Sequence, residues 1–133
     1  MKYLIDTHTF LWTLSSSEKL PKITKAKIVD PNNEIYISAV SLWEIAIKTR
    51  IKKIDLDKID IDDLIPLAEK MGMEFISLTP EESLSYGKLD ESSHFDSFDR
   101  MLIWQSIQRN LTIISKDEEF KKFEKHGLKL LWK

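Results

Sequence analysis

Short apolar runs alternate with segments of helical periodicity along the chain, and this alternation most limits the fold that the chain can adopt. The apolar runs lie at residues 2–5, 35–38, 75–78, 111–115 and 129–132. Between them, apolar side chains recur at the spacing of amphipathic helices. Short apolar strands separated by helices predict a mainly parallel sheet that is covered on both faces. We therefore expect an α/β fold, a three-layer α/β/α sandwich.

The helical segments have recognisable ends. We expect helices at residues 7–14, 22–29, 40–50, 62–71, from residue 80 onward, at 96–110 and at 116–125. Asp30-Pro31-Asn32-Asn33 is a strong turn signal, and Thr79-Pro80 indicates a helix start with proline at the first helical position. Residues 87–95 are polar and predict a loop. The segment 96–110 is apolar on most of its surface, so we expect it to be buried between other elements.

Length and composition indicate an ordinary globular protein. A chain of 133 residues is long enough for one domain with a real core, so we expect a single domain over residues 1–133. The net charge of −2 gives no global attraction to nucleic acid or to a membrane. The absence of cysteine excludes thiolate metal sites and is consistent with the cytoplasm, where we expect the protein. Neither a signal peptide nor a membrane-spanning stretch is expected.

Five carboxylates stand where the predicted elements begin or end: Asp6, Glu44, Asp96, Asp99 and Asp117. Right-handed crossovers bring the carboxyl ends of parallel strands to one edge of the sheet, which is where Asp6 and Asp117 would lie. Clustered carboxylates repel one another unless a cation neutralises them. Ligands that are all oxygen select hard cations such as Mg²⁺ or Mn²⁺ over zinc, and these cations commonly act on phosphates.

Each acid also has a structural explanation when it is considered alone. Glu44 could complete a capping box with Ser41, or pair with Lys48 one turn further on. Asp99 suits the first turn of a helix. Caps do not require a shared sheet edge, however, and Ser, Thr or Asn would cap equally well, so the joint pattern favours a function. The acids that could be helix N-caps are Asp6, Asp96 and Asp117.

Four segments, taken in order, resemble the successive motifs of the PIN domain. The resemblance spans nearly the whole chain and is strongest to the VapC-type toxins of bacterial and archaeal toxin–antitoxin pairs. It implies an α/β/α sandwich and Mg²⁺- or Mn²⁺-dependent cleavage of RNA, in which a metal-activated water attacks the phosphorus in line. It also implies an antitoxin partner and a homodimer. The segments are Leu4-Ile5-Asp6-Thr7-His8, Ser41-Leu42-Trp43-Glu44-Ile45-Ala46-Ile47-Lys48, His94-Phe95-Asp96-Ser97-Phe98-Asp99-Arg100-Met101-Leu102-Ile103 and Ile114-Ser115-Lys116-Asp117.

The same resemblance ranks the acids. Asp6, Glu44 and Asp99 match the core acids of the family. Asp117 matches a more variable fourth acid, and Asp96 an additional aspartate of members with a longer motif, which usually has proline where this chain has Ser97. The resemblance therefore implies that all five are catalytic metal ligands.

Other functions remain open at this point. A haloacid-dehalogenase-type phosphatase also begins with a strand and an aspartate, but it needs a second aspartate two residues later, where His8 stands. A non-catalytic PIN-like module that binds RNA or a partner would keep the fold, and so would a housekeeping nuclease without an antitoxin. His8, His94 and Arg100 could contact substrate or carboxylates, or could be purely structural.

Some apolar residues could belong either to the core or to a groove. The resemblance implies that such a groove binds an amphipathic segment of the antitoxin. The residues that we expect to be divided between core and groove are Phe10, Leu11, Leu42 and Ile45, and the tryptophans that we expect mostly in the core are Trp12, Trp43 and Trp104.

Overall fold

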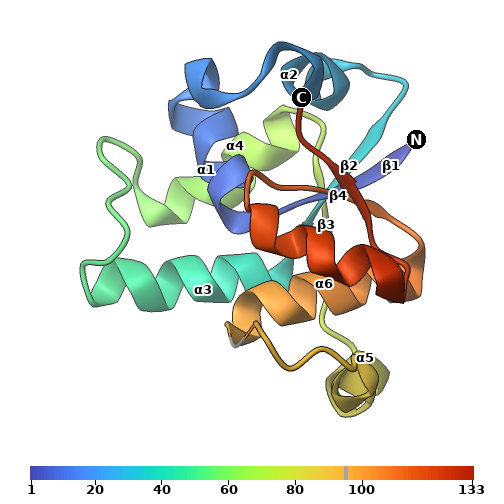
Figure 1. The fold of residues 1–133 in the computed structure, drawn as a ribbon. Coiled ribbons are helices and arrows are strands. Elements are labelled where there is room, and N and C mark those ends of the chain that lie inside the picture. The colour runs from blue at the N-terminus through green and yellow to red at the C-terminus, as the bar shows by residue number, and fades with distance from the viewer. Residues whose placement is uncertain (95) are drawn as a thin grey trace.

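A parallel sheet of five strands forms the centre of the protein, as the alternation of the sequence predicts. The computed structural model describes residues 1–94 and 96–133. The strands lie in the order β3-β2-β1-β4-β5, each parallel to its neighbours (Figure 1). The strand order reverses between β1 and β4, which makes their carboxyl ends the place where α/β folds form ligand crevices. The strands are β1 (Lys2–Ile5), β2 (Glu34–Ser38), β3 (Glu74–Ile76), β4 (Thr112–Ile114) and β5 (Lys129–Leu131).

Helices cover both faces of this sheet, as Figure 1 shows. They are α1 (Thr7–Ser15), α2 (Lys22–Val29), α3 (Ala39–Arg50), α4 (Leu64–Lys70), α5 (Pro80–Ser85) and α6 (Ser97–Arg109). Shorter 3-10 segments lie at Ser17–Lys19, Ile61–Asp63 and Tyr86–Lys88, and a longer one lies at Glu118–His126.

The side chains of β1 alternate between two hydrophobic cores. Tyr3 and Ile5 join one cluster with residues of α1, α2 and α4, whereas Leu4 joins a second cluster with residues of α6 and the C-terminal 3-10 helix. This alternation follows from the two-residue period of a strand. It confirms the three-layer α/β/α sandwich.

The structure differs from the sequence-based expectation in its irregular segments. Residues 116–125 were expected to form an α-helix, but Glu118–His126 is a 3-10 helix. Phe120 and Phe123 are both fully buried there, and about three residues per turn places side chains at that spacing on one face. The expected loop at 87–95 begins with the 3-10 turn Tyr86–Lys88, and its last residue lies outside the described residues.

The apolar residues of uncertain position are now assigned. Phe10 and Ile45 are completely buried and belong to the core, so they line no groove. Trp104 is buried as expected, but Trp43 is 61% exposed, which contradicts its placement in the core. Trp12 is half-buried, as are Leu11 and Leu42, and these three pack against the first core cluster. Among the described residues, no helix is long and apolar enough to cross a membrane.

Candidate metal centre

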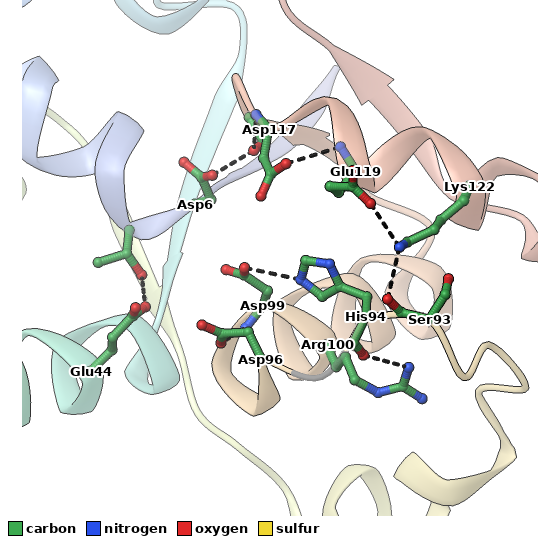
Figure 2. A network of polar contacts seen from close by, with 12 residues as sticks. Asp6, Glu44, Ser93, His94, Asp96, Asp99, Arg100, Asp117, Glu119 and Lys122 are labelled. Carbon is green, nitrogen blue, oxygen red and sulfur yellow. Dashed lines mark hydrogen bonds and ion pairs between the residues drawn. The ribbon is translucent and has the colours of Figure 1, made fainter.

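The five predicted acids line one cavity at the carboxyl edge of the sheet. The cavity has a volume of about 340 Å³. Asp6 follows β1 and Asp117 lies beyond β4, and these two strands are neighbours in the sheet. Helix α3 carries Glu44, and the start of α6 carries Asp96 and Asp99 (Figure 2). Three further kinds of side chain line the same cavity, namely histidine, tryptophan and lysine: His8, Trp12, Lys48 and Lys116.

Three of the acids are helix N-caps, as the structural explanation predicted, and each caps with a single oxygen. Oδ1 of Asp6 accepts a hydrogen bond from the Thr9 amide at 3.0 Å. Oδ1 of Asp96 accepts from the Asp99 amide at 3.0 Å, and Oδ1 of Asp117 accepts from the Glu119 amide at 2.9 Å. The cap leaves the second oxygen of each carboxylate free for another partner. Capping therefore aims these acids at the cavity and does not compete with a role in it.

Ser115 joins the two strand-end aspartates. Its hydroxyl donates to Oδ2 of Asp6 at 2.6 Å and accepts from the Asp117 amide at 3.1 Å. Asp6 is buried, and burial raises its pKa, although hydrogen bonds from Ser115 and Thr9 partly offset that effect. Asp6 is thus a buried carboxylate whose charge is costly without a cation.

Glu44 is buried in a polar network of its own. Its Oε1 accepts from the Thr7 hydroxyl at 2.5 Å, and the same hydroxyl lies 3.0 Å from Oγ of Ser41. Its Oε2 accepts from Nζ of Lys48 at 2.5 Å. The expected capping box with Ser41 is absent, because α3 begins earlier, with Ser38 as its N-cap. The alternative pairing with Lys48 is confirmed, so one internal cation already balances part of the acidic charge.

Asp99 carries the strongest sign of crowded negative charge. Burial and the neighbouring charge of Asp96 raise its pKa from 3.8 to about 7, and Glu44 and Asp6 add to the effect. His94 opposes it, since its Nε2 lies 3.2 Å from Oδ2 of Asp99. A carboxylate with this pKa is only partly ionised at neutral pH, unless a cation enters the cavity and stabilises the charged form.

Among the described residues, the guanidinium of Arg100 forms no ion pair with an acid and no hydrogen bond with Asp96. The guanidinium donates to the main-chain carbonyls of Leu89, Glu91 and His94 and to the Tyr86 hydroxyl. It therefore anchors the segment that precedes α6. The ring of His94 packs edge-on against two phenylalanines of the C-terminal 3-10 helix, with ring centroids 6.0 Å apart in each case.

The acids are not all equally close to one another. Among the described residues, one group of three has ligand atoms that all lie within 4.8 Å, and it consists of His94, Asp99 and Asp117. Asp6 and Glu44 line the same cavity but lie outside this group. The role of His94 was left open by the sequence. The spacing of His94 and Asp99 along the chain does not show that their side chains are in contact, and only the fold does.

The donor set fits a divalent cation. The cavity is lined by five carboxylates and two lysines. Two of the carboxylates, those of Asp6 and Glu44, are buried, and the pKa of Asp99 is raised to about 7. The carboxylates of Asp96 and Asp117 are exposed. The residues that could hold an ion are the five acids together with His94. A hard divalent cation would stabilise the charged forms of these acids.

The fold and the site define a class, that of three-layer α/β proteins with an acidic centre at the point where the strand order reverses. The chain belongs to the PIN domain family, whose sequence profile matches residues 3–126. No curated protein sequence matches the chain.

Solved structures share the fold over nearly the whole chain. A chain of VapBC2 from Rickettsia felis, bound to a DNA fragment from its promoter, is 18% identical with a TM-score of 0.70, and the match covers 100% of both chains. A chain of VapBC-1 from nontypeable Haemophilus influenzae is 19% identical with a TM-score of 0.69, covering 98% of this chain and 97% of that one. A chain of VapBC-5 from Mycobacterium tuberculosis is 16% identical with a TM-score of 0.60, covering 99% and 98%.

Proposed function

We propose that the protein is an Mg²⁺- or Mn²⁺-dependent endoribonuclease and the toxin of a toxin–antitoxin pair. The observation that carries the proposal is the convergence of five carboxylates from distant parts of the chain on one cavity. Membership of the PIN domain family supports it. Structures of the same fold are named as VapBC toxin–antitoxin systems, which supports an antitoxin partner.

In this proposal the acids bind the cation and the lysines contact the phosphates of the RNA. A bound divalent cation supplies an activated water and neutralises charge on the phosphate. Asp6 and Glu44 are buried and held by hydrogen bonds, so they form the fixed wall of the site. Lys48 and Lys116 line the same cavity and can contact an RNA backbone, whose affinity then falls with added salt.

Substitution of Asp6 tests the catalytic proposal. We expect purified protein to cut RNA when Mg²⁺ or Mn²⁺ is present, and we expect Asp6→Asn to abolish cutting while the protein stays folded. Asparagine keeps the capping oxygen but removes the charge. Asp62→Asn, an exposed acid outside the cavity, is the matched control and should cut normally. Cutting in excess EDTA, or by Asp6→Asn, would contradict the mechanism.

The same variants test the toxin assignment in cells. Expression of the wild-type chain should slow growth, and co-expression of a small protein encoded next to it should restore growth. Asp6→Asn should be harmless. If the wild-type chain cuts RNA but leaves growth unchanged, the protein is a housekeeping nuclease and the toxin assignment is wrong. If it neither cuts RNA nor slows growth, the protein is a binding module.

A further inference from the structure

We propose that His94 is a nitrogen ligand of the divalent cation, together with Asp99 and Asp117, and that the centre therefore prefers Mn²⁺ to Mg²⁺. The inference rests on the proposed function, because it names an additional ligand of the same centre. It departs from the expectation of a purely oxygen-based site, and it follows from where the fold places one imidazole.

The positions of the three ligand atoms fit a single ion. Nε2 of His94 lies 3.2 Å from Oδ2 of Asp99, and the ligand atoms of these two residues and Asp117 lie within 4.8 Å of one another. An octahedral ion with bonds of about 2.1 Å separates its ligand atoms by about 3 to 4.2 Å. The group therefore needs to contract by less than about 1 Å to bind one ion. Figure 2 shows the imidazole and the two carboxylates facing the same space.

The imidazole is held in place from several sides. Phe120 and Phe123 contact it edge-on. The main-chain carbonyl of His94 accepts a hydrogen bond from Nη1 of Arg100 at 3.1 Å, and the same guanidinium donates to the Leu89 carbonyl at 2.9 Å. The side chain of His94 is only 12% exposed. Because the ring is already ordered, it loses little conformational entropy when it binds a metal ion, which favours binding.

The chemistry of imidazole gives the metal preference. In the absence of metal, Nε2 can carry a proton and donate to Asp99, and in the other neutral tautomer the proton is on Nδ1 and the lone pair of Nε2 is free. Imidazole is a good ligand for transition metals, whereas Mg²⁺ strongly prefers oxygen. One nitrogen and two carboxylates therefore favour Mn²⁺.

The alternative is that His94 only donates a hydrogen bond to Asp99 and never contacts the ion. Pulsed electron paramagnetic resonance of bound Mn²⁺ separates the two roles, because a nitrogen ligand produces a hyperfine coupling to ¹⁴N. We expect this coupling in the wild-type protein and expect it to disappear in His94→Gln, which keeps an N–H donor for Asp99. It should persist in His8→Gln, because His8 lines the cavity of the five acids but lies outside the group of three.

Binding of the metals alone, measured by calorimetry, gives a second readout. His94→Gln should weaken Mn²⁺ binding by about tenfold or more, and Mg²⁺ binding by less than about threefold. If His94→Gln does not fold, His8→Gln protein with ¹⁵N-labelled histidine still tests the proposal, because the coupling must change with the isotope and His8, the histidine that lines the cavity of the five acids, is then absent.

The outcomes distinguish this proposal from the proposed function. If Mn²⁺ binds to the wild-type protein without a nitrogen coupling, or if the coupling survives in His94→Gln, His94 is not a ligand, and the proposed metal-dependent nuclease is unaffected. If neither Mn²⁺ nor Mg²⁺ binds, the metal centre itself is wrong and the proposed function fails with it.

Discussion

At the scale of single residues, each of the two strand-end aspartates caps a helix and lines the cavity at the same time. Asp6 and Asp117 each cap a helix with Oδ1, and Oδ2 of Asp6 accepts from Ser115. Capping and ligand binding therefore do not exclude one another. A cap fixes the backbone where a strand turns into a helix, and it fixes the direction of the carboxylate at the same time. A serine or threonine cap would fix the backbone equally well but would place no carboxylate at the cavity.

Asp99 gives a pH-dependent prediction for the metal-free protein. Burial and the charge of Asp96 raise the folded-state pKa of Asp99 to about 7, above its ordinary value of 3.8. A carboxylate with a raised pKa makes the folded state lose stability as the pH rises from about 4 through about 7. In EDTA, Asp99→Asn should therefore be more stable than the wild type at about pH 8, by about 1–3 kcal/mol, and equally stable near about pH 4.

Denaturant unfolding at a series of pH values measures this difference. Asp62→Asn, outside the cavity, is the control and should follow the wild-type curve. If the free energies of unfolding of Asp99→Asn and the wild type differ by the same amount at all pH values, ionisation of Asp99 does not destabilise the folded protein and the prediction is wrong. Saturating Mn²⁺ should reverse the order at neutral pH, because it stabilises only the protein that binds it.

At the scale of elements, α6 links the cavity to the core. Five consecutive residues of α6, from Leu102 to Ser106, are buried, which fits a helix between other layers. Gln105 accepts from the Ser38 hydroxyl at 2.6 Å and donates to Glu82 of α5 at 3.0 Å. Burial acts to raise the pKa of Glu82, but hydrogen bonds, first among them that of Arg109, outweigh it and lower the pKa to about 2. Glu82 is thus a buried acid paired with a cation, Arg109, whereas Asp6 accepts its hydrogen bonds from Thr9 and Ser115.

Two substitutions of Asp96 separate its capping role from a role in the metal centre. Asp96→Asn keeps an N-cap for α6, so its free energy of unfolding should change little, whereas Asp96→Ala should lose about 1 kcal/mol. Both remove the charge, and both should weaken the binding of Mn²⁺ measured by calorimetry. If Asp96→Asn binds Mn²⁺ as tightly as the wild type, Asp96 is a cap and nothing more.

At the scale of the whole molecule, an apolar groove of about 280 Å³ lies between α3, α5 and α6. Trp43 and Phe98 line it and contact each other edge-on, with ring centroids 5.4 Å apart. Leu84 of α5 directly follows Ser83, which lines the groove, and is 90% exposed. Exposed apolar patches of this kind mark interaction surfaces. In a two-fold contact between two copies of the chain, Leu84 of each copy would pack into the groove of the other.

We therefore expect the protein to form a homodimer through this surface. The double substitution of Trp43 and Leu84 by serine should convert the dimer to a monomer in size-exclusion chromatography with light scattering. Val29→Ser removes an apolar residue that is 63% exposed on α2 and should leave the dimer intact. A wild-type monomer at micromolar concentration, or a dimer that survives the double substitution, would contradict this assignment of the surface.

The predictions that succeeded depended on periodicity and caps. Local patterns predict the five strands and the burial of α6, because strands and helices have fixed repeats. They also predict Asp96 as the N-cap of α6. The C-terminal 3-10 helix was not predicted, since its apolar spacing of three also fits an α-helix. Trp43 was misplaced because periodicity shows which residues share a helix face and does not show whether another element covers that face.

The sequence by itself determined the fold class and the set of acids at the strand and helix ends, because both depend on local order along the chain. Only the tertiary structure decided which groups meet. It placed the Thr7 hydroxyl on Glu44, tied Asp6 to Ser115, and brought His94 within 3.2 Å of Asp99. These contacts depend on the pairing of β1 with β4 and on how the helices pack at that edge of the sheet, and such packing leaves no periodic signal in the sequence.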